Sequence, residues 1–121
     1  MSQGVPVRSS RFPYVPVHLE VRQRVVDADA LLDTGFDGHV AVPARLLRNG
    51  QAQRPDGYMR WTLADGSVVS APVYAGRISV GRMGPYPAAV TVLGDEVIIG
   101  VRVAARFTIT LDHGHEVIVW Q

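Results

Sequence analysis

One short segment of the sequence has the residue types that acid–base chemistry requires. The apolar pair Leu31 and Leu32 leads directly into Asp33, Thr34 and Gly35. A strand that ends in this way delivers a carboxylate into a tight turn, where the glycine lets a substrate or a second backbone approach closely. Asp33 is therefore the candidate catalytic residue. A D-T-G triplet also arises by chance in roughly a few per cent of chains of this length, so the alternative is that Asp33 only forms an Asx turn.

A second apolar segment lies far along the chain from this triplet. Val97 to Ile99 are followed by Gly100 and by the stretch VRVAARF, whose composition is compatible with a short helix. Between the two segments, Asp65-Gly66 separates two strand-like stretches, which predicts a hairpin there.

Alternation of apolar and polar residues predicts the strands that position these segments. Val15, Val17, Leu19 and Val21 alternate with polar residues, as expected for a half-buried strand. Glycine and proline recur between further Val-rich stretches, which favours an all-β barrel or sandwich. We expect strands at 14–22, 25–32, 40–42, 58–63, 67–74, 78–80, 88–93, 97–99, 107–111 and 116–120, helical turns at 44–48 and 101–105, a loop at 49–57 and a turn at Tyr86.

The length of the chain fits one domain, 1–121. Residues 1–13, which precede the first predicted strand, are expected to form a loose N-terminal arm.

Composition removes several kinds of chemistry. All 12 basic residues are arginines and there is no cysteine, which excludes lysine Schiff bases, thiolate nucleophiles, disulfides and cysteine-bound zinc. No basic run and no apolar run of roughly 18 residues is present, so we expect neither a nucleic-acid nor a membrane partner. His113 and His115 flank a glycine, and a solvated turn is preferred there over a metal site. We expect no cofactor, and a cytoplasmic location because the N-terminal residues lack the apolar stretch of a secretory signal.

The order of these features resembles the retropepsin-like aspartic peptidases. In that family, apolar-Asp-Thr-Gly, a central hairpin, apolar-apolar-Gly and a short helix follow one another, and DTGFDG at 33–38 is similar to the small bacterial members. The similarity runs from about Tyr14 to Asp112. It implies a closed β-barrel with a flap hairpin, and an aspartic endopeptidase that acts on peptides or proteins.

The resemblance also implies a role for each matching residue. Asp33 corresponds to the catalytic aspartate, and Thr34 to the residue whose hydroxyl bonds across a two-fold axis to its mate. Gly35 corresponds to a glycine whose carbonyl meets the substrate backbone. Asp37 stands where the family has an acid that supports the dimer or the substrate main chain.

Two further segments correspond to parts of the same site. Ala64, Asp65 and Gly66 fall at the flap tip, where they would bind substrate. Ile98 to Gly100 correspond to the segment that packs beneath the catalytic loop and supports it.

The sequence departs from the retroviral branch at several positions. Phe36 replaces a small residue, which narrows the expected floor of the site. Val101 stands where that branch has an arginine, with Arg102 next. The flap tip has one glycine rather than a glycine-rich run, and the chain continues beyond Leu111, so the dimer sheet is expected to be built differently.

The chemistry of this family needs two carboxylates at one site, which share a proton because they cannot both ionise when close. The chain has one Asp-[Ser/Thr]-Gly triplet. The second carboxylate must therefore come from a second copy, and a two-fold homodimer with Asp33 on the axis supplies it.

Two other interpretations stay open at this point. A catalytically silent dimeric barrel of the same fold could serve as a protein-binding module. An unrelated β-domain could carry the triplet by chance.

Overall fold

The computed structural model describes residues 5–47 and 54–121. The predicted end of the helical turn at Arg48 and most of the loop predicted at 49–57 therefore lie outside the described residues. None of the described helices is long and apolar enough to cross a membrane.

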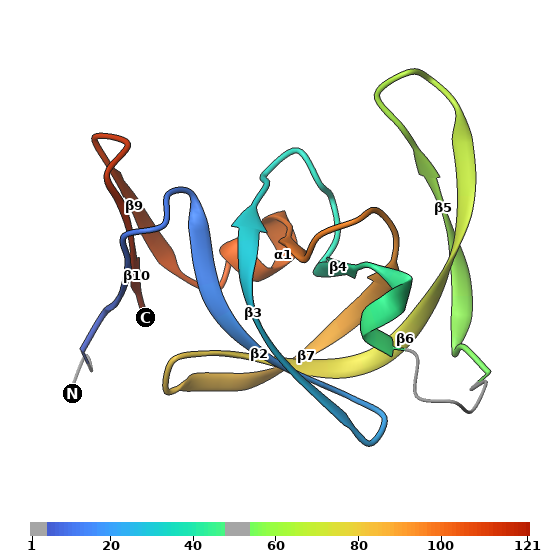
Figure 1. Ribbon diagram of the computed structural model, residues 1–121, viewed down its shortest axis with the longest axis horizontal. Coiled ribbons are helices and arrows are strands. Elements are labelled where there is room, and N and C mark those ends of the chain that lie inside the picture. Colours follow the sequence, from blue (N-terminus) through green and yellow to red (C-terminus); the bar gives the residue numbers. More distant parts are fainter. Residues whose placement is uncertain (1–4, 48–53) are drawn as a thin grey trace.

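Most of the described chain is β-strand (Figure 1). Six strands in the order β2-β3-β8-β4-β7-β6 close into a mixed barrel because β6 also pairs with β2, while β5 extends the sheet beyond β6. A separate sheet has the order β1-β10-β9. The elements are β1 (Val7–Ser9), β2 (Tyr14–Val21), β3 (Arg24–Leu32), β4 (Val40–Val42), the 3-10 helix η1 (Ala44–Leu47), β5 (Gly57–Thr62), β6 (Val68–Val80), β7 (Met83–Val92), β8 (Ile98–Ile99), α1 (Val101–Ala104), β9 (Thr108–Asp112) and β10 (Glu116–Trp120).

The barrel interior is aliphatic. On β2, Val15, Val17, Leu19 and Val21 are all buried, as the alternation of the sequence predicts. They pack with Val, Ile and Ala side chains from the other barrel strands. Removing one such side chain from water contributes about 1.5–3 kcal/mol, so the barrel is held mainly by apolar burial on one face of each strand.

The long strand β6 differs from the prediction. Separate strands at 67–74 and 78–80 are wrong, because β6 runs from Val68 to Val80 without a turn. Its first half pairs with β5, and its second half pairs with both β2 and β7. Gly76 lies where β6 passes β2, and a Cβ there would come within 2.8 Å of the Glu20 carbonyl oxygen. This glycine permits close backbone approach rather than a turn.

The turn predicted at Tyr86 is also wrong. Tyr86 lies inside β7, opposite Ile78 of β6. Among the described residues, the β7 edge opposite β6 pairs with β4 only at the far end of β7, at Val90–Val92. The two prolines beside Tyr86 therefore lie on an exposed edge, where a strand tolerates the missing N–H groups.

The N-terminal arm is more ordered than predicted. Residues 7–9 form β1, which pairs antiparallel with β10 through Val7↔Val119 and Ser9↔Val117. The C-terminal hairpin β9–β10 provides the strand edge for this pairing, so the two ends of the described chain lie together (Figure 1). Residues 1–4 lie outside the described part.

Candidate active site

Strand β8 positions the candidate catalytic residue. It lies between β3 and β4, parallel to β3 (Leu32↔Ile99) and antiparallel to β4 (Val40↔Ile99). Asp33 follows β3 directly, and its backbone N–H donates to the Ile99 carbonyl oxygen over 3.0 Å. The two segments that the sequence singled out, 33–35 and 98–100, are therefore hydrogen-bonded neighbours.

The turn after β3 holds the Asp33 carboxylate in place. The Gly35 N–H donates to Asp33 Oδ1 over 2.9 Å, and the Phe36 N–H donates to the Asp33 carbonyl oxygen over 3.1 Å. This is the geometry of an Asx turn, which also serves to orient a carboxylate. In the single chain Asp33 is half-buried, whereas Thr34 and Gly35 are exposed. Their exposed surface is available to a substrate or to a second copy.

The segment after β8 is hydrogen-bonded to the loop that contains this turn. The Gly100 N–H donates to the His39 carbonyl oxygen over 2.9 Å, and the Val101 N–H donates to the Phe36 carbonyl oxygen over 3.0 Å. A Cβ at Gly100 would lie 2.5 Å from that Phe36 oxygen. The glycine is therefore required for the first turn of α1 to approach the loop so closely.

Asp37 lies on the exposed outer part of the same loop. Its Oδ1 is 3.7 Å from Nε of Arg102 on α1. Both side chains are largely exposed, so this ion pair contributes little to stability. Arg102, which stands one position after the place where the retroviral branch has an arginine, thus contacts Asp37.

The predicted flap tip closes the hairpin between β5 and β6, which projects from the barrel (Figure 1). Gly66 has φ +87°, and Asp65 Oδ1 accepts hydrogen bonds from the Ser67 hydroxyl (2.6 Å) and the Ser67 N–H (2.9 Å). These bonds hold the pKa of Asp65 below its usual value, with the hydroxyl making the larger contribution. Ala64, Asp65 and Gly66 are exposed at the end of the hairpin, away from the barrel.

The hairpin contacts the Asp33 loop further down, through two aromatic side chains. Phe36 and Trp61 have ring centroids 4.9 Å apart with planes tilted by 43°. Phe36 is the residue that was expected to narrow the floor of the site, and nothing in the sequence spacing of Phe36 and Trp61 indicates that they meet.

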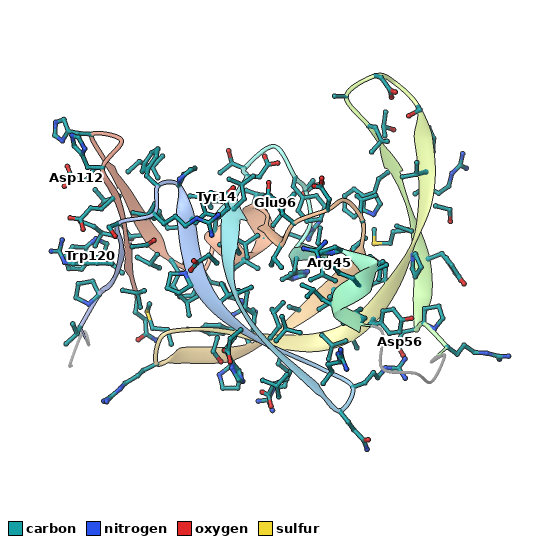
Figure 2. The ribbon with its side chains drawn as sticks, viewed as in Figure 1. Tyr14, Arg45, Asp56, Glu96, Asp112 and Trp120 are labelled. Atoms are coloured by element: carbon teal, nitrogen blue, oxygen red, sulfur yellow. The ribbon has the colours of Figure 1, made fainter. Side chains whose placement is uncertain are left out.

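Tyr14 and Glu96 form a hydrogen-bonded pair that the sequence did not predict. The Tyr14 hydroxyl donates to Glu96 Oε1 over 2.9 Å, and Figure 2 shows the two residues close together near the end of β3. This hydrogen bond raises the pKa of Tyr14. The pair joins the start of β2 to the segment that leads into β8, and Leu31 of β3 lies opposite Tyr14. The two residues are 82 positions apart in the sequence, so no local pattern indicates this contact.

Histidines make no metal site in the described part of the chain, where no group of three or more His, Asp or Glu side chains could hold an ion. His113 lies in the β9–β10 turn with φ 52°, and its Nδ1 is 2.7 Å from Asp112 Oδ1. His39 lies just before β4, and burial lowers its pKa, as do the charges of Arg102 and Arg106.

Two solved structures share the fold of this chain. A retropepsin-like aspartic protease from Rickettsia conorii matches with a TM-score of 0.64 at 18% identity, over 98% of this chain and 92% of that chain. The simian foamy virus protease matches with a TM-score of 0.50 at 20% identity, over 74% of this chain and 91% of that chain. No protein-family profile matches, and no curated protein is significantly similar. The chain therefore has a retropepsin-like fold, as the resemblance predicts.

Proposed function

We propose that the chain is an aspartic endopeptidase whose active site forms when two copies bring their Asp33 carboxylates together. The observation that supports this best is the double anchoring of Asp33. Its backbone is hydrogen-bonded to Ile99, and its carboxylate is oriented by the Gly35 N–H. A carboxylate held this way at the end of a retropepsin-like barrel strand can be presented to a partner with little loss of conformational freedom.

The proposed chemistry uses the two carboxyl groups in different protonation states. The ionised one accepts a proton from a water molecule, whose oxygen attacks the peptide carbonyl carbon. The protonated one donates its proton to the carbonyl oxygen. When the tetrahedral intermediate collapses, the carbon–nitrogen bond breaks and a proton passes to the leaving amine.

The homodimer is part of the proposal because the chain has one such triplet. A two-fold axis beside Asp33 would place the exposed Thr34 of each copy against the other. Gly35 and Asp37 would then meet the substrate main chain, and Ala64 to Gly66 would close over it. A cytoplasmic location is also part of this proposal.

A catalytically silent binding module is the second candidate, because an Asx turn like that of Asp33 also forms in non-catalytic loops. The two functions differ in their response to a transition-state mimic. A peptidase should bind a pepstatin-type inhibitor much more tightly than it binds a substrate peptide of the same length.

The direct test compares purified wild-type protein with Asp33→Asn. Asparagine keeps the shape and accepts the Gly35 hydrogen bond, but it cannot share the proton, so peptide cleavage should be abolished while the fold persists. Cleavage of a peptide library across acidic and neutral pH would be followed by mass spectrometry. The control is Asp112→Asn, which changes an acid of the distant β9–β10 hairpin (Figure 2) and should keep full activity. Undiminished cleavage by Asp33→Asn would exclude this residue as catalytic.

A further inference from the structure

Phe36 and Trp61 join the β5–β6 hairpin to the loop that carries Asp33. Phe36 comes three positions after Asp33, and its N–H donates to the Asp33 carbonyl oxygen over 3.1 Å. Trp61 lies on β5, opposite Val69 of β6. We refer to Phe36 and Trp61 as the aromatic pair.

The aromatic pair packs directly on the backbone of the loop and of α1. A Cβ added at Gly38 would lie 2.6 Å from Phe36 Cζ and 3.0 Å from Trp61 Cη2. A Cβ added at Gly100 would lie 2.6 Å from Phe36 Cδ2. The rings therefore fill the space over these two glycines, and no side chain from outside can occupy that space without moving a ring.

The Trp61 indole N–H lies within this packing. It is buried, and no acceptor among the described residues lies within hydrogen-bonding range. A buried donor without an acceptor is unfavourable, and a ligand atom could reach this N–H only if a ring moved. The burial of the N–H thus shows how closely the aromatic pair packs.

We propose that the aromatic pair determines which peptides the site accepts. The peptide carries a small side chain (Gly, Ala or Ser) at the one position that faces the rings. This inference rests on the proposed peptidase function. A larger side chain must displace a ring and break the ring–ring contact, whereas a small one leaves the pair intact. Misfits of even one methylene in a tight pocket change kcat/KM by about tenfold or more.

The proposal is tested by profiling cleavage of a peptide library. Wild-type protein should cleave peptides with a small residue at one position near the scissile bond at least about tenfold faster than peptides with Leu or Phe there. Phe36→Ala should remove this preference, and Phe36→Leu, which keeps more of the packing, should weaken it. Phe107→Leu is the matched control, because Phe107 forms a second aromatic pair with Tyr86 at 5.7 Å and should leave the profile unchanged.

Trp61→Phe keeps an aromatic ring against Phe36, so the preference for a small side chain should persist in this variant.

The results separate this inference from the function on which it rests. Cleavage with the same profile in wild-type protein and both Phe36 variants would overturn the selectivity and leave the peptidase intact. Folded wild-type protein that cleaves no member of the library would overturn the peptidase, and the selectivity with it.

Discussion

Replacing Gly100 by alanine tests how the two separated segments of the site are held together. The added methyl group would press against the Gly38 carbonyl oxygen and lie 2.5 Å from the Phe36 carbonyl oxygen. Both oxygens belong to the backbone, so neither can move aside by a simple rotation. Overpacking of this kind costs about 1–3 kcal/mol. The loop between Phe36 and Gly38 must therefore shift away from the start of α1.

That shift would strain the hydrogen bonds that join the loop to α1. The N–H groups of Gly100, Val101 and Arg102 donate to carbonyl oxygens of His39, Phe36 and Gly38 over 2.9–3.2 Å. Each such bond contributes about 1 kcal/mol. We therefore expect Gly100→Ala to lower the free energy of unfolding by about 3–5 kcal/mol. Peptide cleavage should fall with it, because the Asp33 turn belongs to the same loop.

The assay is urea unfolding followed by tryptophan fluorescence, at one fixed protein concentration so that any dimerisation affects all variants alike. With a slope of roughly 2 kcal/mol/M, the midpoint should fall by about 2 M. Gly57→Ala is the matched control, since a Cβ at Gly57 meets nothing within 4 Å. Its stability should change by less than about 1 kcal/mol. A Gly100→Ala midpoint equal to that of Gly57→Ala would show that the backbone contact at Gly100 does not constrain the loop.

Three further predictions concern other parts of the molecule. Thr34→Ala should weaken dimerisation more than it lowers monomer stability. Removing a hydroxyl that is hydrogen-bonded across the axis leaves its partner unsatisfied, at a cost of roughly 1–3 kcal/mol on each side. An unchanged dimer dissociation constant in sedimentation would refute the cross-axis role. Hydrogen exchange across 60–72 should slow when a peptide-like inhibitor binds, and equal protection with inhibitor bound would mean that the hairpin is no lid. Asp56 has a pKa held below its usual value by the Ala75 N–H and by Arg22. The stability that Asp56 contributes is complete above its unfolded pKa and is lost as pH falls through its folded pKa. Below about pH 4, the melting temperature of the wild-type protein should therefore fall more steeply with pH than that of Asp56→Asn. An equal fall of the two melting temperatures down to pH 2 would contradict this.

Much of the fold could be predicted because it follows from local patterns. The alternation from Val15 to Val21 places four apolar side chains on one face, and burial of that face requires a strand whatever lies against it. The hairpin at Asp65 likewise depends on neighbouring residues, with Gly66 supplying the positive φ. The turn at Asp33 is local as well, since its orienting hydrogen bond spans two positions.

Other predictions failed because proline and glycine have more than one structural use. The sequence around Tyr86 and Gly76 indicates turns, yet both residues lie inside long strands. A proline interrupts a strand only where its missing N–H is needed, and β7 at Tyr86 lies on an edge. Gly76 is needed for the close approach of β6 to β2. Whether a strand has a neighbour on one side or on both is a property of the assembled sheet.

The sequence by itself determined the candidate residues for the chemistry, the apolar faces that drive barrel formation, and the tight turn that orients Asp33. Only the tertiary structure decided which separated segments meet: β8 between β3 and β4, β1 against β10, Phe36 against Trp61, and Tyr14 against Glu96. The physical reason is that side-chain periodicity reports which face of a strand is buried, but not which strand pairs with its edge. The pairing of each edge depends on how all the strands close into the barrel. In the closed barrel, each strand edge has only one neighbour that also keeps the apolar face of the strand buried.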